Sequence, residues 1–343
     1  MDLVPEDLIL RFSEFKKNIQ KQNFSYGKFW NVASKTFNVE LTKNGFLNKG
    51  ERNYFPAIYE KGKNFNHFLY TDTKKNFKKI KTIRTKEYTE INLKKFCSPK
   101  NSNGATYIAN NFFDIIDNKI DYVPKKILEI GAGSGVLSSI LKNEYDSQIT
   151  IIDIPLVLTC SIAFLMYVFP EKTFCLPNEI GNKELKNFDF IFLFPQQLKY
   201  LNKSDEQDLI INTHSFMEMD YKEVDDYFNF INKKVKNNGY FFCSNRTRKI
   251  NKFFDYPWFK LNNFKKIHIG INKTIKVMKG STIIDFMLRK NINQTYKKNN
   301  LTFLERLYYK NYYFFRERIF WLKVDFKIYA LIHVLKKLIG RKI

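Results

Sequence analysis

The stretch Ile127-Leu128-Glu129-Ile130-Gly131-Ala132-Gly133-Ser134-Gly135 decides the fold of this chain. It begins like a short buried strand, and its three glycines at alternate positions predict a sharp turn, because glycine has no Cβ to obstruct the backbone. A helix is expected to begin near Val136, and the free N–H groups and positive dipole end of that helix would face the turn. The stretch therefore predicts a binding site for a polar ligand.

Strands and helices alternate along the chain after this stretch. Strands are expected at 126–130, 148–153, 208–213 and 240–244, with a further strand at 173–176 or 188–194. Helices are expected at 136–145, at 156–169, and from about Tyr221 to Gly239, which would close the helix. Such alternation predicts an α/β fold, in which a parallel sheet carries helices on both faces. Ligands of these sheets bind beyond the carboxyl ends of the strands.

The chain divides into three predicted regions. Residues 1–104 are expected to form a mostly helical cap or substrate region, and apolar residues recur at helical spacing from Leu8 to Ile19. Residues 105–290 would form the ligand-binding domain, with one or two strands in the alternating segment 267–278. Residues 291–343 predict a basic amphipathic helical tail. This tail either docks on the domain or on a second subunit, or makes peripheral contact with an anionic membrane.

The net charge of +24 is concentrated in the flanks of the chain. Residues 1–125 hold 23 Lys and Arg against 13 Asp and Glu, residues 126–245 hold 11 against 16, and residues 246–343 hold 24 against 5. A nucleic-acid enzyme more often carries its positive field around the active-site mouth. Flanking charge fits an anionic surface beside the site, such as lipid headgroups or a polyanionic glycan, and it equally fits a solvated Lys-rich surface.

Three features predict a cytoplasmic protein, with the inner membrane face as the site of any peripheral contact. The start MDLVPEDLILRF carries acids and lacks the apolar segment of a signal peptide. The longest apolar run, 156–169, has 14 residues, whereas crossing a bilayer takes about 20, so it predicts a buried helix. The four cysteines show no C-x-x-C spacing, which favours free thiols over disulfides, and no His spacing predicts a metal site.

The glycine spacing distinguishes between nucleotide ligands. A dinucleotide site would show G-x-G-x-x-G, with an acid about 20 residues further on. Here Glu129 precedes G-x-G-x-G at 131–135, no phosphate-binding lysine follows, and Asp153 closes the next strand, where a carboxylate can accept both hydroxyls of a ribose. This set resembles motif I and its partner acid in class I S-adenosylmethionine-dependent methyltransferases. The resemblance implies a Rossmann-like sheet and S-adenosyl-L-methionine as the cofactor.

Three segments of the second half are similar to a family of sugar O-methyltransferases from bacterial surface-glycan gene clusters. They are Asp153-Ile154-Pro155 after the second strand, NTHSFMEM at 212–219 after the fourth, and Asn245-Arg246 at the end of the fifth. The similarity covers roughly residues 105–260 and does not extend to the basic tail. It implies transfer of a methyl group to a sugar hydroxyl of a surface glycan or its precursor.

The resemblance also implies roles for residues at the strand ends. The cofactor pocket would be shaped by the turn and its preceding acid, with the ribose held by the acid of strand two: Glu129, Gly131, Gly133, Gly135 and Asp153. The substrate would meet Asn212, Thr213 and Arg246, the last through bidentate bonds to an acidic sugar or a phosphate. Alternatively, Asn212 satisfies backbone groups and Arg246 is an exposed residue of a basic loop.

O-methylation requires a general base, because the hydroxyl loses its proton as the methyl group arrives. His214 is the first candidate, since an unperturbed imidazole has a pKa of about 6.5. Glu218 is the second candidate, as the base or as the group that orients His214. Glu218 could equally cap the start of a helix.

Two other functions stay open at this level. The basic flanks would suit an RNA methyltransferase, although the fourth strand ends in Asn212-Thr213-His214-Ser215 rather than the N-P-P-[YF] run of enzymes that methylate base amino groups. A non-catalytic, membrane-associated protein with a decayed methyltransferase fold is the third hypothesis. The intact glycine run and Asp153 argue against it.

Overall fold

The structure is a computed structural model that describes residues 3–21, 38–43, 45–48, 111–181, 184–201, 205–246, 248–249, 252–253, 261, 263–272 and 283–293. The predicted tail helix, from residue 294 onward, and most of the predicted cap at 1–104 lie outside these residues. The described residues thus comprise most of the predicted ligand-binding domain and the parts of the N-terminal region that contact it.

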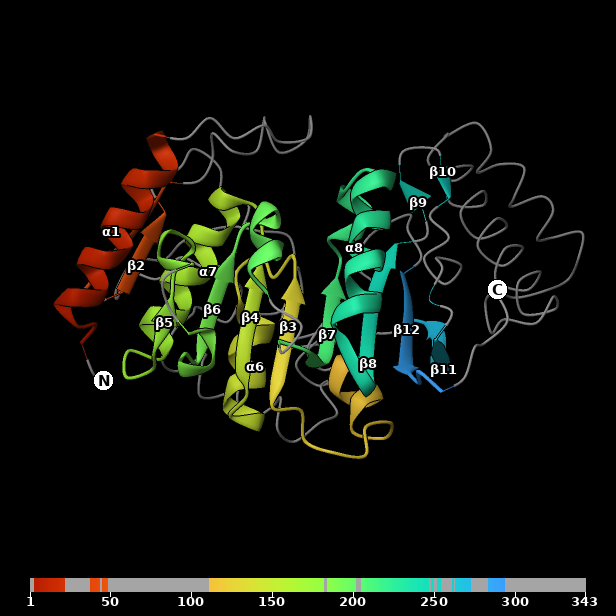
Figure 1. The fold of residues 1–343 in the computed structure, drawn as a ribbon. Helices are drawn as coiled ribbons and strands as arrows, with labels where there is room; N and C mark the ends of the chain where they lie inside the picture. The colour runs from red at the N-terminus through yellow and green to blue at the C-terminus, as the bar shows by residue number, and fades with distance from the viewer. Residues whose placement is uncertain are drawn as a thin grey trace, which may run out of the picture.

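One eight-stranded sheet organises the described part of the chain, in the order β11-β12-β8-β7-β3-β4-β6-β5 (Figure 1). The strands are β3 (Lys126–Ile130), β4 (Gln148–Ile152), β5 (Phe174–Cys175), β6 (Phe190–Leu193), β7 (Gln207–Thr213), β8 (Val235–Arg246), β11 (Phe264–Ile271) and β12 (Ile283–Lys290). Two short hairpins stand apart from it: β1 (Val39–Thr42) with β2 (Gly45–Asn48), and β9 (Arg248–Lys249) with β10 (Lys252–Phe253).

The strand order reverses at β3. This strand pairs in parallel with both β4 and β7, while β6 and β5 continue the sheet beyond β4, and β8 continues it beyond β7. At the far edge, β12 is antiparallel to both β8 and β11. In such a sheet a crevice opens outside the carboxyl ends of the strands at the reversal point. The carboxyl end of β3, whose arrow points upward in Figure 1, is therefore the expected ligand site.

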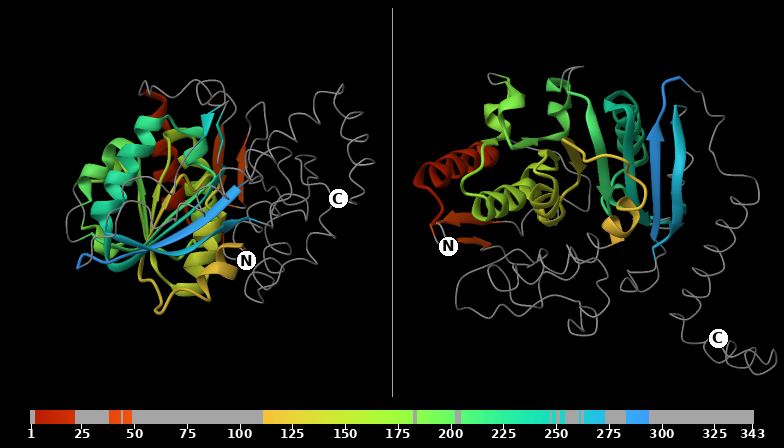
Figure 2. Two further views of the ribbon diagram at one scale, coloured as in Figure 1. Left: turned by 90° about the vertical axis from the view of Figure 1, so that its right-hand side faces the viewer. Right: turned by 90° about the horizontal axis from the view of Figure 1, so that it is seen from below.

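Helices cover both faces of the sheet, as predicted. One face packs against α6 (Val136–Tyr145), α7 (Pro155–Val168) and the helical residues 111–116, and the other packs against α8 (Tyr221–Lys234). The left view of Figure 2 shows the sheet between α8 and the helical residues 111–116. The buried side chains of α8 are Val224, Tyr227, Phe228 and Ile231, and their helical spacing places them on the one face that packs on the sheet.

The apolar run predicted as a buried helix is α7, and it is apolar almost all round because it is enclosed on several sides. The helix α1 (Glu6–Lys21) and the strand β1 pack against it from outside, and α6 lies beside it. Arg11 of α1 fastens this outer layer, because its guanidinium binds both carboxylate oxygens of Glu179 at 2.8 and 3.0 Å. The N-terminal region thus contributes a helix and a hairpin to the same hydrophobic core.

The observed elements differ from the prediction in the number of strands and in the end of one helix. Both candidate third strands form, as β5 and β6, and β12 completes the sheet where no strand was expected beyond 278. The helix α8 ends at Lys234 instead of Gly239, because the ammonium of Lys290 in β12 donates to the carbonyls of Asn232 and Val235 at that end. Gly239 instead allows close approach within β8, where an added Cβ would lie 3.1 Å from the carbonyl oxygen of Asp208.

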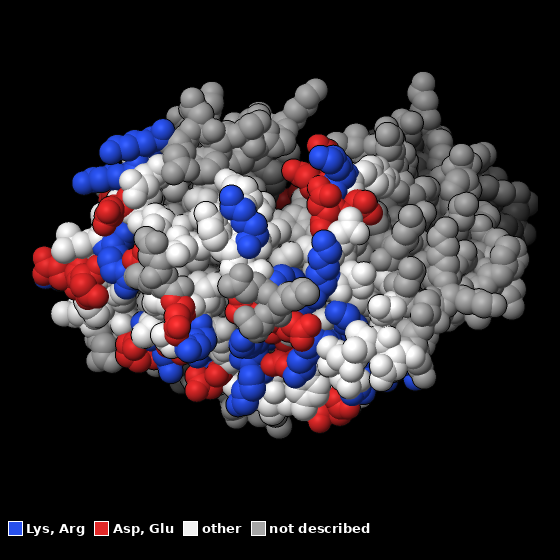
Figure 3. Space-filling model, viewed as in Figure 1, with Lys and Arg blue, Asp and Glu red and all other residues white. Residues whose placement is uncertain are grey.

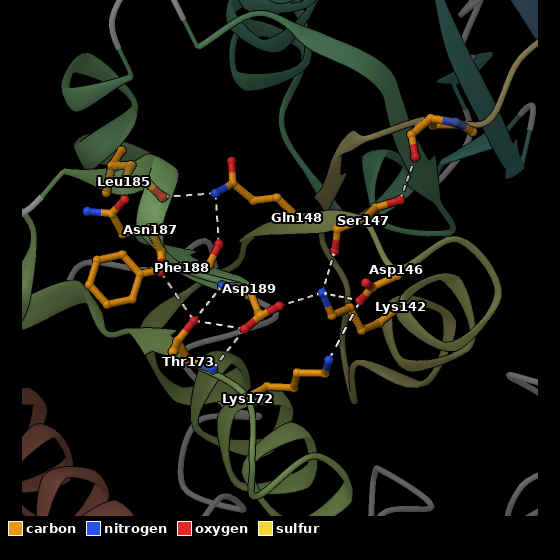
Figure 4. Close-up of polar contacts among 11 residues, drawn as sticks. Lys142, Asp146, Ser147, Gln148, Lys172, Thr173, Leu185, Asn187, Phe188 and Asp189 are labelled. Atoms are coloured by element: carbon orange, nitrogen blue, oxygen red, sulfur yellow. Dashed lines mark hydrogen bonds and ion pairs between the residues drawn. The ribbon is translucent and has the colours of Figure 1, made fainter.

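A polar network closes the amino-terminal edge of the sheet, opposite the expected ligand site (Figure 4). The buried ammonium of Lys142 donates to Asp189 at 2.6 Å and to the carbonyl of Ser147 at 3.0 Å. Burial raises the pKa of Asp189, but hydrogen bonds from Lys142 and Thr173 outweigh burial and lower it to about 2. These bonds tie the end of α6 to β6 and have a structural role.

Charges of both signs mix on the face drawn in Figure 3, with acidic side chains near the start of α8. The exposed acids there are Asp220, Glu223, Asp225 and Asp226. This matches the slightly acidic balance of residues 126–245. Within the described ranges, no helix is long and apolar enough to cross a membrane, and no cluster of three or more His, Cys, Asp or Glu side chains could hold a metal ion.

Candidate functional site

The glycine turn lies where the fold predicts a ligand. Gly131, Gly133 and Gly135 adopt φ angles of +70°, +60° and +78°, a region that other residues rarely enter. The N–H of Gly131 donates to the carbonyl of Ile152 at 2.7 Å, which ties the turn to the end of β4. An added Cβ on Gly131 would collide with the side chain of Ser215. The first glycine is therefore required both by its φ angle and by its neighbour.

Asp153 follows β4 directly and faces the turn. Its Oδ2 accepts the N–H of Gly133 at 2.9 Å, and its Oδ1 accepts the N–H of Ile154 at 2.7 Å. Each carboxylate oxygen keeps a second lone pair, so the group can still accept hydrogen bonds from a ligand. Burial raises the pKa of Asp153, and the two donated bonds oppose that rise. Part of the residue is exposed to solvent, which also limits the rise.

Glu129 lies beneath the turn and is only 1% exposed. Its Oε2 accepts the hydroxyl of Ser138 in α6 at 2.5 Å, which ties the first turns of that helix to β3. Burial raises the pKa of Glu129 to about 7, the bond from Ser138 opposes this, and the nearby charge of Asp153 adds to it. The two predicted acids of the cofactor site therefore lie close together beside the glycine turn.

Asn212 ends β7 and is fully buried. Its amide nitrogen donates to the carbonyl of Ile130 at 2.9 Å and to the hydroxyl of Ser215. Its amide oxygen accepts Nδ2 of Asn245 at 2.7 Å and the N–H of Phe216 at 3.4 Å. This use of both polar atoms agrees with the alternative that Asn212 satisfies backbone groups. The predicted contact between Asn212 and a substrate would require one of these bonds to open.

The other predicted substrate and base residues lie at the same edge of the sheet. Thr213 is the last residue of β7 and pairs with Ser244 of β8, and the N–H of His214 donates to the carbonyl of Ser244 at 2.8 Å. His214 has a φ of +64°, which is uncommon for a residue other than glycine. Glu218 ends the short 3-10 helix η5 (Phe216–Glu218). His214 and Glu218 are both partly exposed, and their catalytic roles stay predictions.

Arg246 is the last residue of β8 and pairs with Ile283 of β12. Its backbone therefore lies at the carboxyl end of β8, but its side chain is outside the described part of the structure. The predicted bond from Arg246 to a substrate stays a prediction.

Sequence reasoning missed two features of this edge. The first is the contact between Ser215 and Gly131. The motif predicts a glycine at position 131, but nothing near it in the sequence indicates that Ser215 packs against it. Asp285 of β12 is buried next to Ser244 and accepts Nδ2 of Asn111 at 3.0 Å and Nδ2 of Asn272 at 3.1 Å. Burial raises the pKa of Asp285 to about 6, against the bonds from Ser244, Asn111 and Asn272. Its strand was not predicted, so this cluster could not be foreseen.

No protein-family model and no curated protein matches the sequence. Among solved structures, TehB from Haemophilus influenzae is similar with 15% identity and a TM-score of 0.37, over 52% of this chain and 62% of the TehB chain. The N-methyltransferase NodS from Bradyrhizobium japonicum WM9, in complex with S-adenosyl-L-homocysteine, gives 11% identity and a TM-score of 0.38, over 60% of this chain and 98% of that one. The chain thus spans less than two thirds of TehB.

Proposed function

We propose that the protein is an S-adenosylmethionine-dependent O-methyltransferase that acts on a sugar hydroxyl of a surface glycan or its precursor. The observation that carries this proposal is the arrangement of Asp153 beside the glycine turn at the point where the strand order reverses. Three left-handed glycines bring bare backbone to the carboxyl edge of the sheet, and a carboxylate with free lone pairs lies next to them.

The residues of the turn fit this cofactor. A ribose presents two adjacent hydroxyl donors, and the two oxygens of Asp153 can accept both without giving up their bonds to Gly133 and Ile154. The turn at 131–135 leaves room for a nucleoside to approach the backbone, since none of its glycines carries a side chain. When bound, S-adenosylmethionine supplies an activated methyl group on a sulfonium centre. The protein then has to orient the acceptor and remove its proton.

His214 is the proposed base for that proton. With the donor held by Asp153 and the glycine turn, its sulfonium would supply the methyl group to the acceptor oxygen and would leave as a neutral thioether. The hydroxyl proton passes to the imidazole of His214, with Glu218 as the orienting group. The end of β7 supports this role, because it presents His214 at the carboxyl edge shared with β3. A general base contributes about 10²- to 10⁴-fold in rate.

The test uses a labelled methyl donor and a panel of acceptors: nucleotide sugars, lipid-linked glycans and RNA. Label in a saccharide supports the proposal, whereas label in RNA with a steep dependence on salt would replace it with the RNA hypothesis. The variant His214→Asn keeps the backbone intact, because Asn tolerates positive φ better than most residues do. It is expected to lose at least about 100-fold in turnover with unchanged affinity for the methyl donor. Turnover within threefold of wild type would remove His214 from the mechanism.

A further inference from the structure

The segment from His214 to Glu218 is held by its own backbone N–H groups. The N–H of His214 donates to the carbonyl of Ser244, and the N–H of Glu218 donates to the carbonyl of Ser215 at 2.9 Å. Between them, the N–H of Phe216 reaches Oδ1 of Asn212 at 3.4 Å, and the N–H of Met217 reaches Oδ1 of Asn245 at 3.3 Å. Two buried side-chain amides therefore hold the loop that carries both candidate bases.

The two amides also hold each other. Nδ2 of Asn245 donates to Oδ1 of Asn212 at 2.7 Å, and Asn212 and Asn245 are 0% and 1% exposed. Buried amides that satisfy one another in this way resist rotation, because turning either side chain would place two donors or two acceptors face to face. The pair therefore fixes the end of β7 against the end of β8.

The same network reaches the glycine turn. Nδ2 of Asn212 and the hydroxyl of Ser215 both donate to the carbonyl of Ile130, at 2.9 and 3.2 Å. That carbonyl belongs to the peptide group whose N–H, on Gly131, donates to Ile152. The first peptide of the turn is thus bonded to β4 on one side and to the loop after β7 on the other. The side chain of Ser215 also packs directly against Gly131.

We infer that Asn212, Ser215 and Asn245 are positioning residues that couple the glycine turn to the loop carrying His214 and Glu218. A ligand that orders the turn would also order the loop through the Ile130–Gly131 peptide, and it would thereby hold the candidate base more firmly in place. Chains of hydrogen bonds can carry coupling between two sites, and the amide pair and Ser215 form such a chain between the loop and the turn. The inference rests on the proposed function only for the choice of ligand.

Hydrogen exchange with S-adenosyl-L-homocysteine as the probe tests the coupling. In the wild-type protein, saturating probe is expected to slow exchange of the Phe216 and Met217 N–H groups as well as that of Gly131. In Ser215→Ala the probe should still slow exchange at Gly131, but its effect at Phe216 and Met217 should fall by about fivefold to tenfold, the worth of one buried hydrogen bond. Equal protection of the loop in Ser215→Ala and wild type would overturn the inference.

The matched control is Ser161→Ala. Ser161 packs against another glycine of the turn, since a Cβ on Gly135 would lie 3.1 Å from its Cβ, but its hydroxyl donates to the carbonyl of Leu158 within α7. Ser161→Ala should therefore leave the probe-dependent protection of the loop unchanged, whereas a general loss of stability would affect both variants. Loss of protection in both would also overturn the inference.

If the probe does not bind the wild-type protein, the proposed cofactor is refuted. The coupling between the turn and the loop is then tested by hydrogen exchange in the ligand-free protein. In that case Asn245→Ala, which removes the acceptor for Met217, should speed exchange at Met217 and also at Gly131 in the turn after β3. Faster exchange confined to the loop would show that no coupling exists. The proposed cofactor and the proposed coupling are therefore refuted by different experiments.

Discussion

Gly131→Ala should destabilise the turn through backbone strain and through a collision with Ser215, and a second substitution at Ser215 should relieve the collision. At a φ of +70°, alanine costs roughly 1 kcal/mol in backbone strain. Its Cβ would also collide with the Cβ and Oγ of Ser215, and overpacking of this kind costs typically about 1–3 kcal/mol. The variant should therefore lose about 2–4 kcal/mol of unfolding free energy, and Tm should fall by about 4–16 °C if each kcal/mol shifts it by about 2–4 °C.

The partner change Ser215→Gly removes both colliding atoms, so a double-mutant cycle isolates the collision. Thermal or urea unfolding of wild type, Gly131→Ala, Ser215→Gly and the double variant should give a favourable coupling of about 1–3 kcal/mol, because the double variant keeps only the backbone strain. The cofactor affinity of the double variant should recover in part. A coupling below about 0.5 kcal/mol would show that Ser215 does not lie against Gly131, and the reasoning about the turn would fail.

Two further predictions concern the carboxylates and the far edge of the sheet. Burial raises the pKa of Glu129 from its ordinary 4.5 to about 7, so between these pH values the folded protein holds a proton that the unfolded chain releases. The unfolding free energy should therefore fall as pH rises through this window, by up to about 1.4 kcal/mol per pH unit. In urea titrations at several pH values, Glu129→Gln should remove this part of the pH dependence. An identical pH dependence in the variant would contradict the raised pKa of Glu129. Lys142→Met removes the buried donor of Asp189 and of the Ser147 carbonyl, and it should lower the unfolding free energy by about 1–3 kcal/mol. The affinity for the methyl donor should not change, because this network lies at the opposite edge of the sheet. A large loss of affinity would show that the two edges are linked.

The sheet could be predicted from sequence because its signals are local. The buried strands around Ile127, Ile149 and Ile210 are short apolar runs bounded by turn residues, and Gly131 and Asp153 lie at their ends. The end of α8 could not be predicted, because the capping ammonium of Lys290 comes from a strand 55 residues after Val235. Contacts between distant segments decide such boundaries.

In the candidate site, too, some features follow from local sequence and others depend on contacts between distant segments. The φ angles of the turn and the place of Asp153 follow from residue type and spacing. The role of Asn212 does not, because it depends on Asn245 and Ser215, which meet only when β3, β7 and β8 align. An asparagine at a strand end predicts either a substrate contact or a backbone contact, and the structure shows the backbone contacts.

Calorimetric titration of S-adenosylmethionine and S-adenosylhomocysteine into the wild-type protein, Asp153→Asn and Asp146→Asn tests the central claim most directly. Asp146 carries the same chemical change at the opposite edge, where it is exposed at a φ of +46° that Asn tolerates. The proposal predicts binding to wild type, at least about tenfold weaker binding to Asp153→Asn from the loss of a charged acceptor, and unchanged binding to Asp146→Asn. Absence of binding to wild type, or equal affinity in Asp153→Asn, would contradict it.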